Sequence, residues 1–373
     1  MLYEIHMLKN YPSTNLNRDD TGAPKTCVFG GVTRGRISSQ CLKRSWRTFP
    51  QFKELVGASN LGIRTRELPE LVAQVLKNRN YEEKQYQPFL SPITGIANKE
   101  GAENKDGTRT AQVIFYAPED VEAIADVVES YIQSGVKKVK AKEMQEAVKD
   151  AAIRPITLDI ALFGRMVTSD AFRNVEAAMQ VAHAVSTNRI VLESDYFTAM
   201  DDMLTGESME STGSAMIGDT DYNSACYYIY ASIDSDTLQD NLRFGENPDL
   251  LVQKAIPALL QTMAWSNPTG KQNSFAGHVL PSAVLVECKE KKVPVSYVNA
   301  FVEPAYATQK RDLVAASAEK LVQECDMIAR NFGVPVSKRL WFCVDKYAIT
   351  PPQQAISCDT FGALVEEVAN TLG

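Results

Sequence analysis

The chain has 373 residues and a net charge of −7, with 45% hydrophobic and 23% charged residues. This length exceeds a typical single domain, so one core with a sizeable insertion, or two domains, is expected. No apolar stretch is long enough to cross a bilayer and no secretory signal opens the chain, so the sequence predicts a cytoplasmic protein without a membrane partner. Seven scattered cysteines without a CxxC pair, beside three histidines, argue against a zinc site and against a disulfide scaffold.

The first predicted element is a strand over Leu2–Leu8, where apolar residues alternate. Residues 1–50 carry eight Lys or Arg and three acids, a net charge of +5, and residues 25–47 contain no acid. Such a local excess of positive charge on an acidic chain is typical of a surface that binds a polyanion. Gly30 and Gly31 lie in this segment, and their missing side chains would let the backbone approach a ligand closely.

A helix is expected over Gln40–Phe49, capped by Ser38 or Ser39, whose hydroxyl can accept from the exposed amides of the first turn. Lys43 and Arg47 are one turn apart and therefore lie on one face of this helix. The helix is interpreted as part of a polyanion-binding surface. The alternative is a solvated basic helix beside an ordinary hairpin turn.

Residues 57–153 are predicted to be mainly helical and to form an inserted subdomain. Within it, Asp120–Gln133 places Val and Ile residues on one helical face, the pattern of an amphipathic helix. Ile156–Val167 is apolar again, and Phe172–Val185 is predicted to be a further helix. His183 would then lie on an apolar helix face and is interpreted as a core histidine.

A low-complexity stretch, Met203–Thr220, precedes a strongly predicted strand over Ala225–Ile233. An excursion of this kind between strand-like segments indicates a protruding hairpin or arm, and its apolar residues suggest that it packs on a neighbour or on bases. A disordered loop is the alternative. The last third alternates between the two kinds of element: helices over Leu250–Ala264, Asp312–Asn331 and Phe361–Leu372, and strands over Val279–Cys288 and Leu340–Val344. This order predicts an α+β fold in which helices cover a sheet.

The candidates for a catalytic site are three pairs of aspartates: Asp19-Asp20, Asp201-Asp202, and Asp219 with Asp221. Paired carboxylates could hold Mg²⁺ for cleavage of a phosphodiester. Adjacent aspartates are more often turn residues, however. No Walker-type loop is present, so nucleotide hydrolysis is not expected.

Several blocks of sequence, in order, carry a family resemblance: NLNRDD at residues 15–20, FGG at 29–31, RISSQCLKR at 36–44, LDIALFGRMVT at 158–168, QVAHAVST at 180–187 and DYFTAMDD at 195–202. They resemble the CasC family, the backbone subunits of the CRISPR surveillance complex Cascade, subtype I-E, of the RAMP superfamily. The resemblance implies an RRM-like (ferredoxin-like) palm made of residues 1–56 and 154–373, with its basic helix at 38–49. It also implies helical fingers inserted at 57–153 and a thumb arm at 200–222.

The resemblance also implies site residues. Those matching family positions that line the RNA groove are Arg18, Lys25, Ser38, Gln40, Lys43, Arg44, Arg47, Arg165, Met166 and, in the segment PTGKQ, Lys271. Those matching the wedge and thumb are Tyr196, Phe197, Thr198, Met216 and Ile217. The resemblance also implies that the strand is wedged at Arg165-Met166. From the residues alone, core packing would be favoured for Met166 and Phe197.

The implied function is that of a repeating, non-enzymatic subunit without metal or cofactor. It would hold a CRISPR RNA (crRNA) guide by its phosphates and splay bases at intervals so that the spacer can pair with target DNA. The implied partners are the crRNA, target DNA through the guide, further copies head to tail in a helical filament, and other Cascade subunits, in antiviral defence. The rival hypothesis is a metal-dependent RNA endonuclease of the same superfamily, using Asp19 and Asp20.

Overall fold

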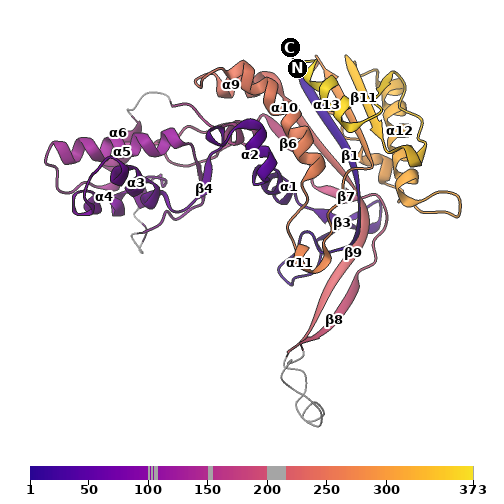
Figure 1. Ribbon diagram of the computed structural model, residues 1–373, viewed down its shortest axis with the longest axis horizontal. Helices are drawn as coiled ribbons and strands as arrows, with labels where there is room; N and C mark the ends of the chain where they lie inside the picture. Colours follow the sequence, from indigo (N-terminus) through magenta and orange to yellow (C-terminus); the bar gives the residue numbers. More distant parts are fainter. Residues whose placement is uncertain (100, 102–103, 105–107, 150–153, 200–215, 373) are drawn as a thin grey trace, which may run out of the picture. The chain divides into compact units, whose positions relative to one another are not determined.

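The computed structural model describes residues 1–99, 101, 104, 108–149, 154–199 and 216–372. The chain divides into two compact units, coloured by sequence in Figure 1. Unit 1 combines residues 1–49, 181–232 and 259–373, and unit 2 combines residues 50–180 and 233–258. Helices and strands are mixed along the chain, so the predicted α+β class is confirmed.

Unit 1 is built on a mixed sheet. In sheet order its strands are β12 (Ala355–Ser357), β11 (Lys338–Cys343), β10 (Ala283–Lys289), β1 (Leu2–Thr14), β9 (Met216–Asp234), β7 (Ala184–Ser186), β3 (Val32–Ile37) and β2 (Thr26–Phe29); β6 (Met179–Val181) and β8 (Glu193–Ala199) also pair with β9. β1 runs antiparallel to β10, with Leu2 opposite Lys289 and Leu8 opposite Ala283. β12 runs parallel to β11.

Helix α12 (Leu313–Phe332) covers one face of this sheet. Leu321 and Cys325 of the helix lie in one buried cluster with Leu8, Tyr228 and Trp341 of the strands. The helix begins where Asp312 accepts a hydrogen bond from the Ala315 amide and ends at Gly333, whose φ of 59° is left-handed. α13 (Phe361–Ala369) contacts β11. β1 is buried along Leu2–Leu8 on both faces, which explains its apolar composition.

The interior of unit 1 also holds a charged network. Lys289 pairs with Glu4 and, at 3.2 Å, with Glu287, while the Arg339 Nε donates to Glu287 at 2.7 Å. Burial raises the pKa of Glu4, whereas burial of Glu287 is outweighed by the positive charges around it, so its pKa is lowered. Because lysine and arginine neutralise both acids, this cluster is structural.

Unit 2 is mainly helical. Its helices are α2 (Pro50–Val56), α3 (Leu68–Asn78), α4 (Glu83–Gly95), α5 (Pro118–Gln133), α6 (Ala141–Lys149), α7 (Leu158–Phe163), α9 (Ser235–Leu242) and the first part of α10 (Pro248–Trp265); β4 (Ile63–Thr65) pairs with β5 (Ile114–Tyr116). The apolar face expected on residues 120–133 is present, since Val121, Ile124 and Val128 lie in the buried core of this unit.

The described residues also form the short helices η1 (Ala58–Asn60), α11 (Gln272–Phe275), η2 (Val298–Phe301) and η3 (Asp345–Tyr347). Among the described residues, no helix has the length and apolar composition needed to span a membrane.

One predicted helix is wrong. Residues 172–185 contain no helix and end in the strands β6 and β7, with Val185 opposite Tyr228 of β9. Val175, Val181 and Val185 are β-branched residues that suit a strand, and pairing with a distant strand decides the outcome for so short an apolar stretch. The first strand is also longer than predicted, because β1 continues to Thr14.

Candidate nucleic-acid interface

The basic helix of unit 1 is α1 (Ser39–Arg47). The Ser38 hydroxyl accepts from the Cys41 amide at 3.3 Å, so the predicted cap is confirmed. The Ser38 amide donates to Asn17 Oδ1 at 2.9 Å, which ties the start of the helix to the loop before β2. Leu42, Ser45 and Trp46 are buried, and this apolar side fixes which face of the helix remains outside.

The outer face of α1 carries positive charge. Gln40 and Arg44 are exposed, and Lys43 and Arg47 are half-buried. Burial lowers the pKa of Lys43. The helix contains no acid, so its surface side offers cationic and amide groups to an anion.

A cavity of about 570 Å³ lies beside α1. It is lined by residues of the 16–22 loop, including Arg18 and Asp19, by Cys41, Arg44 and Ser45 of the helix, and by Thr269 and Gly270. Arg18 and Arg44 are exposed. The cavity therefore brings together two guanidinium groups that are 26 residues apart in the sequence, although it also contains Asp19 and Asp20.

Lys271 follows this cavity lining directly. Its φ is 50°, a left-handed conformation that few non-glycine residues adopt, and its side chain is half-buried. The preceding Gly270 packs so closely on the chain that an added Cβ would lie 2.3 Å from the Leu16 carbonyl oxygen. The close packing fixes the Lys271 backbone next to the 16–22 loop. The Lys271 ammonium group is therefore attached to the fold at a defined place beside the cavity.

The acid pair Asp19-Asp20 lies in the same loop. Asp19 Oδ1 accepts from the Thr21 amide at 2.9 Å, the Thr21 hydroxyl at 2.7 Å and the Ala23 amide at 3.1 Å. The Thr21 hydroxyl contributes most to holding the pKa of Asp19 below its ordinary value. These are the contacts of a turn-forming aspartate.

Gly30 and Gly31 form the turn between β2 and β3, with φ values of 61° and 76°. A Cβ at Gly30 would lie 1.9 Å from the Val302 carbonyl oxygen. At Gly30 the missing side chain therefore allows a close approach of the chain's own backbone, whereas a Cβ at Gly31 would meet nothing within 4 Å.

Arg34, a cation of the basic segment, is fully buried. Its guanidinium donates to five backbone carbonyls, those of Phe29, Ser186, Thr187, Phe301 and Val302, at 2.7–3.3 Å. The side chain joins three separate stretches of unit 1 and is structural. Its place could not be read from the sequence, because all of its partners are backbone carbonyls.

Arg36, Lys25 and His183 form a second basic group. Arg36 donates to the Thr26 carbonyl at 3.3 Å, and one of its terminal nitrogens lies 3.0 Å from His183 Nδ1. His183 is exposed, so the interpretation as a core histidine is wrong. Partial burial first, and then the charges of Arg36 and Lys25, lower the pKa of His183. Sequence reasoning missed this histidine because it placed residue 183 on a helix.

The paired strands β8 and β9 run out from the sheet, as Figure 1 shows. Tyr196 is 64% exposed and Phe197 is 41% exposed, so core packing of Phe197 is wrong. The Phe197 ring lies across Gly218, its partner in the register. Thr198 is exposed opposite Ile217, and Met216 opposite Ala199 begins β9. The backbone of Met216 and Ile217 is described, their side chains are not, and residues 200–215 lie outside the described chain.

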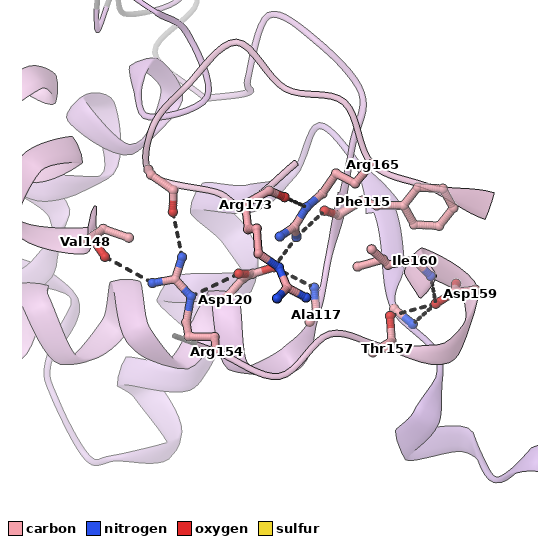
Figure 2. A network of polar contacts seen from close by, with 12 residues as sticks. Phe115, Ala117, Asp120, Val148, Arg154, Thr157, Asp159, Ile160, Arg165 and Arg173 are labelled. Atoms are coloured by element: carbon pink, nitrogen blue, oxygen red, sulfur yellow. Dashed lines mark hydrogen bonds and ion pairs between the residues drawn. The ribbon is translucent and has the colours of Figure 1, made fainter. Parts of the chain in front are cut away.

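Arg165 and Met166 belong to unit 2. Arg165 is 5% exposed, donates to the Asp120 carboxylate at 2.5 Å and to the Phe115 and Arg173 carbonyls, and is thus used inside the unit (Figure 2). The expected contact between Arg165 and RNA does not agree with this placement. Met166, the next residue, is 93% exposed, so core packing is wrong for it as well.

The sequence model of the CT1975-like protein family matches residues 3–367. The chain belongs to this family. The CasC-type resemblance of its motifs is thereby confirmed. Comparison with curated proteins yields no match.

Two solved structures share the fold of this CT1975-like chain. A chain of a "CRISPR RNA-guided surveillance complex, pre-nicking" superposes with a TM-score of 0.82 at 22% identity. A chain of a "CRISPR RNA-guided surveillance complex" superposes with a TM-score of 0.63 at 20% identity. In both cases the match covers 100% of each chain, so the likeness includes both units of the CT1975-like chain.

The candidate residues of the CT1975-like chain therefore fall into separate groups. In unit 1, the cavity and α1 gather Arg18, Gln40, Lys43, Arg44 and Arg47, with Lys271 adjoining. Ser38 is 6% exposed and its hydroxyl caps α1. Lys25 lies beside Arg36 and His183. Tyr196, Phe197 and Thr198 lie on the paired strands. Met166 lies on unit 2. The described residues contain no group of three or more His, Cys, Asp or Glu arranged to hold a metal ion.

Proposed function

We propose that this protein is a crRNA-binding backbone subunit of a CRISPR surveillance complex of subtype I-E. The observation that carries the proposal is the acid-free outer face of α1 beside a cavity holding Arg18 and Arg44, on a chain of the CT1975-like family. The two structural relatives, which are chains of RNA-guided complexes, support it further.

The chemistry of this surface suits a guide of any sequence. Arginine, lysine, serine and glutamine side chains contact phosphates and riboses, and such contacts carry no base information. Pairing between the guide and its target DNA then provides the specificity. Met166 and the aromatic residues of the paired strands are apolar groups that can insert between bases and unstack them at intervals.

In this proposal residues 1–56 and 154–373 form an RRM-like palm, residues 57–153 form helical fingers, and the β8–β9 arm belongs to the thumb. Copies would join head to tail, and because such a contact is heterologous it produces an open helical filament rather than a closed ring. Other subunits of the complex would bind at the ends of this filament.

The protein would not be an enzyme. The rival function, a metal-dependent RNA endonuclease at Asp19 and Asp20, has less support because the Asp19 carboxylate is occupied by its own turn. Cleavage of RNA in Mg²⁺ would distinguish this nuclease from a binding subunit.

The test is binding of the full chain to a labelled single-stranded RNA of arbitrary sequence, in EDTA and in Mg²⁺, with a denaturing gel of the same samples. We expect binding in EDTA and intact RNA in Mg²⁺. The double variant Lys43→Ala with Arg47→Ala should weaken binding equally for all sequences and reduce the slope of log K against log salt by about 1.4, because about 0.7 is lost per contact to a single strand.

The matched control is Lys291→Ala with Lys310→Ala, which removes the same charge from exposed positions of unit 1 that do not belong to α1 or to the lining of its cavity. This control should change the slope little. An equal change in both double variants would show that only net charge matters. RNA shortened in Mg²⁺, and protected by Asp19→Asn, would replace the proposal by the nuclease.

A further inference from the structure

Met166 has an unusual setting. It is 93% exposed, yet its neighbours Arg165 and Val167 are 5% and 6% exposed. A single exposed apolar side chain needs no explanation by itself. The buried structure that fixes the backbone on both sides of Met166 does require an explanation.

The backbone around Met166 is held by hydrogen bonds. Arg165 and Val175 exchange amide-to-carbonyl bonds of 2.9 and 2.8 Å, which close the loop formed by residues 165–175. The Val167 amide donates to Asn174 Oδ1 at 2.7 Å. Both neighbours of Met166 are therefore fixed through their main chains, and the Met166 side chain is directed outward by this extended segment.

The Arg165 side chain adds a second level of fixation. Its Nε donates to the Arg173 carbonyl at 3.0 Å, and one terminal nitrogen donates to the Phe115 carbonyl at 3.2 Å and to Asp120 Oδ2 at 2.5 Å (Figure 2). A guanidinium that bonds in several directions within its plane has one permitted orientation. The fixed guanidinium in turn restricts the position of the Arg165 Cα, which directly precedes Met166.

Asp120 is itself immobilised. Its Oδ2 accepts from the Ala117 amide at 3.0 Å at the beginning of α5, and its Oδ1 accepts from Arg154 Nε at 3.1 Å. Arg154 also donates to the Ala171 carbonyl at 2.6 Å, within the same loop. The contacts thus run from the first turn of α5 through Asp120 to both parts of the 165–175 loop.

The far side of the loop is anchored in the core of unit 2. The Ser169 hydroxyl donates to the Ile96 carbonyl at 2.5 Å and accepts from Gln145 Nε2 at 2.6 Å. Phe172 is buried against Tyr116, and the Arg165 guanidinium lies 5.7 Å from the Phe172 ring centre. Of the whole loop, Met166 is the large apolar side chain left outside.

We infer that Asp120 and Arg165 are positioning residues that present Met166 for insertion between two bases of a bound single-stranded RNA. The inference rests on the proposed guide-binding function. A buried ion pair is seldom the most stable filling for a protein interior, so its benefit here is orientation. Methionine suits the inserted position because its thioether is polarizable and adapts to the flat faces of any base.

The experiment uses the full chain and a single-stranded RNA with 2-aminopurine placed at successive positions, since this base brightens when it is unstacked. Wild-type protein should brighten some positions and not others, and Met166→Ala should remove most of that enhancement. Arg165→Lys keeps the charge opposite Asp120 but loses the bonds in several directions, so we expect the enhancement to fall by half or more. RNA affinity should change less than twofold.

Two further variants make the result specific. Arg173→Lys is the matched control, because it makes the same chemical change in the same loop, where the guanidinium bonds the Asn241 carbonyl at 3.3 Å and faces Phe244. It should leave the enhancement at the wild-type value. Asn174→Ala removes the bond to Val167 from an exposed residue without disturbing a buried charge, and should also reduce the enhancement.

The outcomes separate the two levels of the proposal. Loss of enhancement in Arg165→Lys and Asn174→Ala, with RNA still bound, supports the positioning role. Wild-type enhancement in those variants, while Met166→Ala loses it, overturns that role and leaves the guide-binding function intact. Unchanged enhancement in Met166→Ala overturns the insertion itself. No RNA binding by wild-type protein overturns the proposed function and the inference together.

Discussion

The basic segment of unit 1 and the 165–175 loop of unit 2 place charged and apolar side chains in opposite ways. In residues 25–47 every cation except Arg34 reaches solvent at least in part. In the loop, Arg165 is inside and the apolar Met166 is outside. The two buried arginines share one property: carbonyl or carboxylate oxygens accept from their guanidinium groups on several sides. An arginine in these two regions is thus buried where enough oxygen atoms accept hydrogen bonds from its guanidinium group, although the side chain is charged.

The largest expected effect tests this rule at Arg34. Arg34→Met should lower the free energy of unfolding by about 4 kcal/mol, because the buried carbonyls that it serves would lose their donor. Arg44→Met, the same change on an exposed side chain of α1, should stay within about 0.5 kcal/mol. Urea unfolding of both variants measures the difference. Equal destabilisation would mean that the carbonyls around Arg34 find other donors.

A second prediction concerns a buried basic group that lacks a charged partner in direct contact. His6 is fully buried, its Nδ1 is 2.8 Å from the Tyr228 hydroxyl, and burial lowers its pKa to about 3. The unfolded chain, with a pKa near 6.5, therefore takes up a proton before the folded chain does.

His6 should thus cost stability as the pH falls from about 6.5 to about 3, with a slope approaching about 1.4 kcal/mol per pH unit. Above pH 6.5 the contribution disappears. His6→Phe should flatten this part of the stability profile by that amount, measured by urea unfolding at a series of pH values. Parallel profiles for the two proteins would mean that the pKa of His6 is the same in the folded and the unfolded chain.

The smallest effect is expected at the exposed histidine. Phosphate oxygens near His183 would offset the charges of Arg36 and Lys25 that lower its pKa. RNA binding would then be coupled to proton uptake, so affinity should rise about twofold between pH 7.5 and pH 6 at constant salt. His183→Gln should remove this rise while leaving the affinity at pH 7.5 unchanged. Fluorescence anisotropy gives both values, and an identical pH dependence would place the RNA away from His183.

The fold was predictable where the signal is local. The Ser38 cap, the apolar face of residues 120–133 and the alternating residues of 225–233 all depend on neighbours within a few positions, and all three are present. The strands β6 and β7 were mistaken for a helix because their pairing with β9 involves residues more than 40 positions away. Short apolar stretches do not reveal such pairing.

The site was predictable only in part, for the same reason. The positive charge of α1 is visible in the sequence, but the partners of Arg34 lie up to 268 positions away and are backbone atoms. Arg165 and Met166 are adjacent in the sequence, and their opposite burial depends on Asp120, which lies 45 positions before Arg165. Residue type alone would have placed the arginine outside and the methionine inside.

Strand β9 begins in the arm and ends in the middle of the sheet. Its part over Ala225–Ile233 is buried, whereas Gly218–Tyr222 pairs with β8, whose described side chains are exposed. A two-stranded ribbon is marginally stable in water, so its amides should exchange with deuterium far faster than those at the buried end. One continuous strand would then carry a gradient of hydrogen-exchange protection. Contact between the arm and a partner should increase the protection of the amides in the arm part of β9 toward that of the buried part. The exchange rates along β9 would then report assembly residue by residue.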